Sequence, residues 1–182
     1  IYFKIKMKPV LMIHEFKEEY FDIPLDKYIL TFDDGLYTQY KFIDELKKIN
    51  TEKIFFISSN IICPEDKDQD DNFIKCIDAH KKAFNNDFTN YMKWSQIKKI
   101  DSLDNCFIGC HSHFHQLKTA SCVECIILDN RLMMFDFIKN LGYVPRKFCF
   151  PYNYQTPLYK EILSLKGFKS FYGNERIDIN TL

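Results

Sequence analysis

Two short segments of this 182-residue chain carry side chains that could perform chemistry. Asp33 and Asp34 are adjacent at the end of an apolar run, and His111 and His115 follow much later, four positions apart. Zinc and similar ions accept nitrogen and oxygen ligands, and a catalytic zinc site keeps one coordination position open for water. One carboxylate and two imidazoles could therefore bind a metal ion while the second carboxylate acts as a base. Each segment alone also fits a simple turn or scattered surface histidines, so it is their combination that favours a metal site.

The strands and helices that must position these residues are indicated by the apolar pattern. Short apolar runs bounded by turn residues alternate with segments of helical periodicity, which predicts a parallel α/β sheet. We expect one α/β domain over residues 1–182, with an exposed, charged loop at 63–71. The expected strands are 10–14, 27–32, 53–58, 106–110, 147–150 and 168–172, and the expected helices are 38–50, 72–84, a short one from Trp94, 121–141 and 157–166.

Four segments resemble the polysaccharide deacetylase family, also described as NodB homology domains or carbohydrate esterase family 4. Thr-Phe-Asp-Asp-Gly (31–35) and His-Ser-His-Phe-His (111–115) are similar to the first two motifs of the family. Phe-Cys-Phe-Pro-Tyr (148–152) resembles its aromatic-Pro-Tyr motif, and Val-Leu-Met-Ile-His (10–14) its first strand. The resemblance implies a distorted, incomplete (β/α) barrel with the site at the C-terminal ends of the strands, where the βα-loops converge. An open doubly wound sheet is the alternative.

The resemblance also implies a reaction, namely metal-dependent hydrolysis of an N-acetyl group on a carbohydrate with release of acetate. By the family pattern Asp34, His111 and His115 are the metal ligands, and Asp33 is the general base that takes a proton from metal-bound water. Family precedent places the backbone N–H of Tyr152 in the oxyanion hole. Zinc is the expected metal, although cobalt, nickel and iron suit the same ligands. The spacing of the two histidines predicts that their imidazoles share one face of a helical turn.

Two departures from the family pattern affect the catalytic groups. Many members carry an arginine that braces the catalytic aspartate at the position of Cys149, and Arg146, Lys147 and Arg176 are the candidate substitutes. The late Leu-x-His motif that supplies the general acid is missing, because no histidine follows the second motif. His14 is the candidate replacement, since an imidazole is a suitable proton donor to an amine leaving group. The alternative for His14 is a hydrogen-bonded histidine of the core.

Four other polar residues receive structural predictions. Ser112 is expected to orient the histidine loop, and His113 to point away from the metal. Asn153 is expected to adopt a left-handed backbone, which asparagine tolerates better than most residues. His80, beside two lysines in an expected helix, is predicted to be a solvated residue.

The composition limits the partners and the compartment. Lys plus Arg and Asp plus Glu are equal at 25 each, so the charge does not favour nucleic acid or an anionic membrane. No apolar run approaches the roughly 20 residues needed to span a bilayer. Residues 1–7 do not resemble a secretory signal, although an upstream segment could be missing. The seven cysteines are irregularly spaced, which favours free thiols in the cytoplasm; a zinc site on Cys106, Cys110, Cys122 and Cys125 is the less favoured interpretation.

Two alternatives to a sugar deacetylase are compatible with the same residues. One is a catalytically silent carbohydrate-binding relative, suggested by the missing arginine and the missing late histidine. The other is a metal-dependent hydrolase of a different non-peptide C–N bond. The expected partner is an N-acetylated carbohydrate, and the sequence determines neither which sugar it is nor the oligomeric state.

Overall fold

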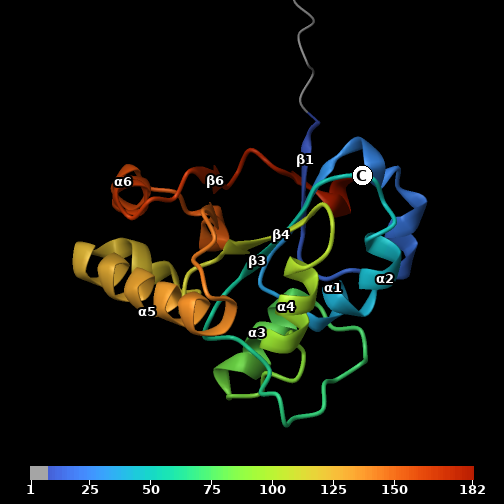
Figure 1. The fold of residues 1–182 in the computed structure, drawn as a ribbon, viewed down its shortest axis with the longest axis horizontal. Coiled ribbons are helices and arrows are strands. Elements are labelled where there is room, and N and C mark those ends of the chain that lie inside the picture. Colours follow the sequence, from blue (N-terminus) through green and yellow to red (C-terminus); the bar gives the residue numbers. More distant parts are fainter. Residues whose placement is uncertain (1–7) are drawn as a thin grey trace, which may run out of the picture.

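The computed structural model describes residues 8–182, and its centre is a curled sheet of seven parallel strands (Figure 1). The strands are β1 (Val10–Ile13), β2 (Ile29–Phe32), β3 (Lys53–Ile57), β4 (Cys106–Cys110), β5 (Lys147–Cys149), β6 (Ser170–Tyr172) and β7 (Ile177–Asp178). Their order is β6-β5-β4-β3-β2-β1-β7. From β1 to β6 the chain crosses the sheet in one direction, whereas a doubly wound sheet reverses its strand order. The expected incomplete (β/α) barrel is confirmed, with β6 and β7 as its two edges.

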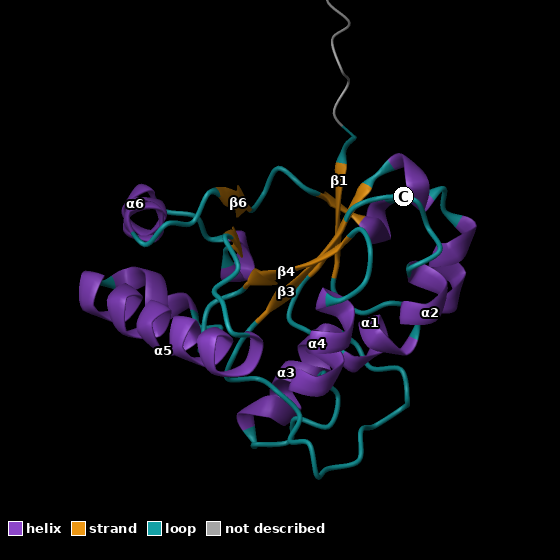
Figure 2. Ribbon diagram, viewed as in Figure 1, coloured by secondary structure: helices purple, strands orange, loops and turns teal. Residues whose placement is uncertain are grey.

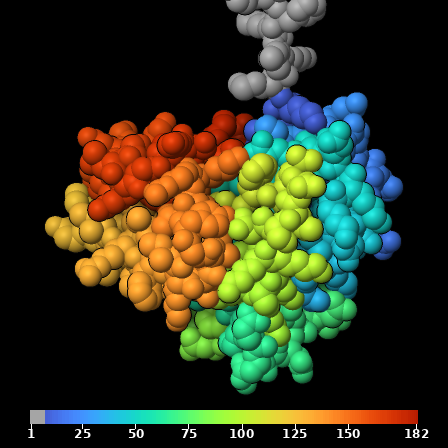
Figure 3. All heavy atoms as spheres, in the orientation of Figure 1, coloured from blue at the N-terminus to red at the C-terminus, as the bar shows by residue number. Residues whose placement is uncertain are grey.

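Helices surround the sheet (Figure 2). They are α1 (Tyr37–Lys41), α2 (Ile43–Leu46), α3 (Cys76–Phe84), α4 (Trp94–Asp101), α5 (Val123–Leu141) and α6 (Pro157–Leu165). Short 3-10 segments occur at Glu18–Asp22, Leu25–Lys27, Leu117–Ser121, Pro151–Asn153 and Ile179–Thr181. Helices α5 and α6 lie beside the β6 half of the sheet, and α1 and α2 lie beside the β1 half. In the space-filling view the yellow-green segment around β4 lies between the blue-to-cyan and the orange-to-red segments, as the strand order requires (Figure 3).

The expected helix at 38–50 is wrong as a single element. The backbone breaks at Phe42, where φ is −99° and ψ is 17°, and the second piece ends at Leu46. The ring of Phe42 packs against Phe16 and Phe21, with centroids 5.5 and 5.9 Å away. The break therefore coincides with an aromatic cluster that is not visible in the helical periodicity. The helix expected at 72–84 begins only at Cys76, and β7 was not expected because two residues are too short to show a pattern.

The two faces of β3 show how the interior of the barrel is filled. Side chains alternate along a strand, so Phe55 packs in the main core beneath the helices while Phe56 points to the inside of the curl. The ring of Phe56 lies 5.0 Å from that of Tyr172, and Gly109 on β4 leaves room for it. The interior is thus packed with side chains, and the functional groups lie where the strands end.

The cysteines differ in part from the expectation. Cys122 and Cys125 form a disulfide at the N-terminus of α5, so the expectation of free thiols fails for this pair, whereas the other five cysteines are free. Their Cα atoms are 5.3 Å apart, within the usual range for a disulfide, because Cys122 caps the helix and Cys125 lies in its first turn. The zinc site on four thiols is therefore not formed. None of the described helices is long and apolar enough to cross a membrane, and the interpretation of residues 1–7 falls outside the described residues.

Candidate metal centre and active site

The C-terminal ends of four strands deliver their polar side chains to one cavity. β1 is followed by His14, β2 by Asp33, β4 by His111, and β5 by the Pro-Tyr pair. The cavity has a volume of about 290 Å³, and its lining includes every residue of the predicted site: His14, Asp33, Asp34, His111, His115 and Tyr152. Groups separated by much of the sequence therefore share one site.

Asp34 lies at the centre of an imidazole cluster. Its Oδ1 is 2.9 Å from Nε2 of His115 and 3.2 Å from Nε2 of His111, and all three residues are buried. Two ligands that are each about 2.0–2.2 Å from one ion lie about 3 Å from each other, so these separations suit a shared cation. Although these two nitrogens are close, neither makes a hydrogen bond to Oδ1 of Asp34, and this oxygen has no hydrogen-bond partner among residues 8–182. A buried acceptor of this kind is normally satisfied, and a bound cation would satisfy it.

The ring of His111 is oriented by a contact with the main chain of β5. Its Nδ1 is 2.8 Å from the carbonyl oxygen of Cys149. A carbonyl only accepts hydrogen bonds, so Nδ1 carries a proton, and in the neutral ring Nε2 is then the nitrogen that could bind a metal on the Asp34 side. The main chain of β5 therefore selects the tautomer that a metal ligand requires.

His111 and His115, the two expected ligand histidines, do not lie on a helix, so the expectation from their spacing is wrong. After β4 the chain forms a tight loop in which Ser112 and His115 have positive φ of 64° and 51°. The hydroxyl of Ser112 accepts a hydrogen bond from the backbone N–H of His115 at 2.9 Å, which confirms its orienting role. Left-handed residues that only the surrounding structure can enforce often occur at functional sites.

Buried Asp129 of α5 holds the same loop from the other side. Its carboxylate accepts hydrogen bonds from the backbone N–H groups of His113 and Phe114, at 3.0 and 2.9 Å. The imidazole of His113 contacts Ser59 and Asp136, at 2.8 and 3.0 Å, and so points away from the cluster as expected. Asp129 was not predicted from the sequence because nothing local links α5 to the histidine motif.

Arg176 replaces the arginine that is missing at the position of Cys149. Its guanidinium donates to Oδ1 and Oδ2 of Asp33, at 2.7 and 2.8 Å, a bidentate geometry. It also donates to Sγ of Cys149 at 3.1 Å. The other two candidates face elsewhere, since Arg146 binds the carbonyl of residue 166 and Lys147 pairs with Glu52.

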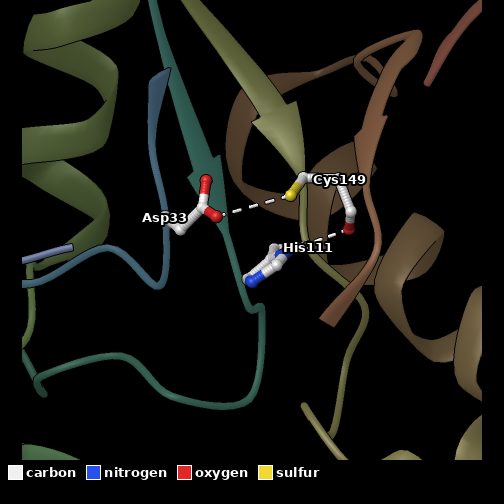
Figure 4. Close-up of side chains that lie close together, drawn as sticks. All are labelled: Asp33, His111 and Cys149. Carbon is white, nitrogen blue, oxygen red and sulfur yellow. Dashed lines mark hydrogen bonds between the residues drawn. The ribbon is translucent and has the colours of Figure 1, made fainter. Parts of the chain in front are cut away.

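Asp33, His111 and Cys149 form a second group of possible metal ligands (Figure 4). The thiol of Cys149 lies 3.5 Å from Oδ2 of Asp33. However, the guanidinium of Arg176 already contacts both Asp33 and Cys149, and a second cation there would be repelled. The residues suit a metal ion only on the Asp34 side.

The two aspartates are both charged at neutral pH. Burial by itself would raise the pKa of Asp33, but the charge and hydrogen bonds of Arg176 outweigh it and lower that pKa. Burial also opposes ionisation of Asp34, and the surrounding imidazoles hold its pKa well below the usual range. Asp33 is thus an ionised carboxylate, separate from the cluster and able to accept a proton.

His14 and Tyr152 border the cavity from opposite ends of the sequence. Buried Gln39 ties the first two strands together, because its Nε2 donates to the carbonyls of His14 and Asp33, each at 2.6 Å. Tyr152 has a φ of 56°, and its ring lies 4.8 Å from that of His115. Asn153 follows with a φ of 54°, as expected for asparagine in place of glycine. The catalytic roles of His14 and Tyr152 remain predictions.

His80 and Cys76 also reach the cluster, although the sequence analysis assigned them no role there. Nε2 of His80 is 3.3 Å from Oδ2 of Asp34, and the thiol of Cys76 donates to the same oxygen at 3.0 Å. The prediction that His80 is solvated is wrong, because only 17% of its side chain is exposed to solvent. Both residues lie on α3, and their i, i+4 spacing was the available signal that they share one face.

No family model and no curated protein matches the sequence, but solved structures with a similar fold include deacetylases. IcaB from Ammonifex degensii superposes with a TM-score of 0.66 at 19% identity, covering 94% of this chain and 85% of that one. A de-N-acetylase from Aggregatibacter actinomycetemcomitans has a TM-score of 0.63 at 13% identity, covering 93% and 92%. BA3943 from Bacillus anthracis, a CE4 family pseudoenzyme, has a TM-score of 0.52 at 14% identity, covering 91% and 43%. The chain therefore has the fold of the polysaccharide deacetylases, and the resemblance seen in the motifs is confirmed at the level of the fold.

Proposed function

We propose that this chain is a metal-dependent deacetylase that hydrolyses the N-acetyl group of a carbohydrate and releases acetate. The observation that carries the proposal is that the two adjacent aspartates have different partners. Asp34 faces the imidazoles of His111 and His115 at 3.2 and 2.9 Å, while Asp33 is held apart by Arg176 in the same cavity.

Asp34, His111 and His115 would hold the metal ion, for which zinc is well suited. When bound, it would polarise the amide carbonyl and lower the pKa of water towards roughly 7. The support from this structure is the unsatisfied Oδ1 of Asp34 together with the tautomer that Cys149 imposes on His111.

Asp33 is the general base in this proposal. It is ionised, and Arg176 fixes both of its oxygens, so it can accept a proton from the attacking water without reorienting. A lowered pKa weakens it as a base, which an acidified water offsets. The bidentate contact with Arg176 thus lowers the basicity of Asp33 and fixes the position of its carboxylate.

His14 is the general acid in this proposal, and the backbone N–H of Tyr152 is the donor to the oxyanion. His14 follows β1 while Asp33 follows β2, so acid and base lie side by side on neighbouring strands. An imidazole there could protonate the departing amine. A single oxyanion donor of the kind assigned to Tyr152 is typically worth about 10²–10³ in rate.

The test is acetate release from N-acetylglucosamine oligomers. Asp33→Asn should lower the rate at least about 10²-fold, since a general base contributes about 10²–10⁴. Asp136→Asn is the matched control, because this carboxylate pairs with His113 outside the cavity. A strong chelator should abolish release, and added zinc should restore it. Acetate release that survives both Asp33→Asn and chelation would overturn the mechanism.

A catalytically silent carbohydrate-binding relative is the second candidate function. It is favoured by the fold shared with a CE4 pseudoenzyme. The bidentate contact of Arg176 with Asp33 speaks against it, because the brace for the base is present. Calorimetric binding of a glycan, with no acetate released from any acetylated sugar, would favour this candidate.

A further inference from the structure

His80 approaches the metal cluster from α3, outside the motifs that define the proposed site. Its Nε2 is 3.3 Å from Oδ2 of Asp34, and its ring stacks on that of His115 with centroids 4.6 Å apart and planes 10° apart. Among the residues that the structure describes, Nε2 of His80 is buried and has no hydrogen-bond partner. In the described part of the chain, three buried atoms without a hydrogen-bond partner belong to this small cluster: Nε2 of His80, Oδ1 of Asp34 and Nδ1 of His115.

The distances from the Asp34 carboxylate to the three imidazole nitrogens suit ligands that share one ion, and Asp34, His80 and His115 form a group that could hold a metal. Ligands about 2.0–2.1 Å from a shared ion lie about 2.9 Å apart at a right angle and about 3.3 Å apart at a tetrahedral angle. The distances from the Asp34 carboxylate to the nitrogens of His115, His111 and His80 are 2.9, 3.2 and 3.3 Å. His80 faces Oδ2 while the other two face Oδ1, so both carboxylate oxygens border the place where the imidazoles meet.

Contacts of His80 itself and of the start of α3 hold His80 in this position. The buried hydroxyl of Tyr91 lies 3.2 Å from Nδ1 of His80. With Nδ1 as donor to that hydroxyl, Nε2 is the unprotonated nitrogen and can bind a cation. The first residue of the helix, Cys76, donates its backbone N–H to the carboxylate of Glu15 at 3.1 Å, and Ala79 is fully buried.

We infer that His80 is a fourth protein ligand of the metal, an inference that rests on the proposed metal site. The ligand set is then three imidazoles and one carboxylate. Such a set favours zinc, cobalt, nickel or iron over magnesium and calcium, which prefer oxygen ligands. It also exceeds the three protein ligands usual for catalytic zinc, so water would take a fifth position, an expansion that zinc permits.

Cobalt(II) titration of the purified chain, followed by visible absorption, tests the inference without relying on activity. His80→Ala should weaken Co²⁺ binding by more than the roughly 10–100-fold that loss of an outer-shell partner costs, and should change the visible bands. Tyr91→Phe should weaken binding within that range and keep the bands. His113→Ala is the control, because it removes an imidazole that points away from the cluster, and it should leave both unchanged. Circular dichroism of each metal-free variant checks that it is folded.

The outcomes separate this inference from the proposed function. If His80→Ala keeps the visible bands and loses no more than about 100-fold in affinity, His80 only positions Asp34 and the inference is overturned. A thiolate-to-cobalt band that disappears in Cys76→Ser would give the fourth position to sulfur and would also overturn it. In both cases the metal site of Asp34, His111 and His115 stands. Failure of the unaltered chain to bind Co²⁺ at all would remove the proposed function as well.

Discussion

Replacing Arg176 with methionine removes the cation that faces Asp33 and fills much of the same space. The side chains of Arg176 and Asp33 are both buried, with 0% and 3% of their surface exposed. The guanidinium contacts both carboxylate oxygens. Removing one partner of a buried ion pair costs about 3–5 kcal/mol, because the other charge is left uncompensated. Domains are stable by only about 5–15 kcal/mol, so Arg176→Met should lose a large share of the free energy of unfolding.

The loss should depend on pH in a definite direction. In the unaltered protein the pKa of Asp33 is lowered, so the stability it contributes is present above the unfolded pKa of about 3.9 and is lost as the pH falls through the folded value. In Arg176→Met the largest cause that lowers the pKa of Asp33 is gone. Burial then raises this pKa against only the weaker charges of His111 and His14, so the folded state binds a proton more readily than the unfolded state. The difference in free energy of unfolding between the unaltered protein and Arg176→Met should therefore be largest at neutral pH and should shrink as the pH falls. Urea unfolding followed by circular dichroism at about pH 7 and about pH 5 measures both values.

Two comparison variants give the result its meaning. Lys147→Met breaks the pair with Glu52, whose side chains are 27% and 35% exposed, and should cost only about 0–1 kcal/mol. Adding Asp33→Asn to Arg176→Met removes the stranded charge and should recover part of the loss. The reasoning is refuted if Arg176→Met costs no more than Lys147→Met at neutral pH and its deficit does not change with pH.

Three further predictions concern the acid, the metal and the packing of the barrel. His14→Ala should lower acetate release about 10²–10⁴-fold and leave Co²⁺ binding intact; an unchanged rate would exclude His14 as the acid. Zinc at about 100 times its Kd should raise the free energy of unfolding by about 2.7 kcal/mol in the unaltered chain, and an equal rise in Asp34→Asn would contradict the site. Gly109→Ala should lower the free energy of unfolding by about 1–3 kcal/mol in urea, because the new Cβ would overlap the ring of Phe56; no loss would mean that the ring lies elsewhere.

The sequence alone determined where six of the seven strands lie and which residues follow them. Apolar runs bounded by turn residues predict strands within one or two residues at β1, β3 and β4, because the period of side-chain alternation and the turn chemistry are local properties. Adjacent Asp33 and Asp34 at one strand end and the histidines at another were sufficient to predict a common site, since parallel strands end at the same edge of the sheet.

Only the tertiary structure decided which distant groups complete that site. Arg176 lies just before β7, a strand too short to predict, and its position beside Asp33 depends on the curl that carries β7 next to β1. His80 reaches Asp34 because Ala79 of α3 packs against Leu36 and Ile61, which follow β2 and β3, and the sequence pattern does not encode these contacts. The histidine loop took left-handed turns instead of a helix because Asp129 and Ser112 bind its N–H groups. Local patterns specify elements, whereas contacts across long loops depend on how those elements pack.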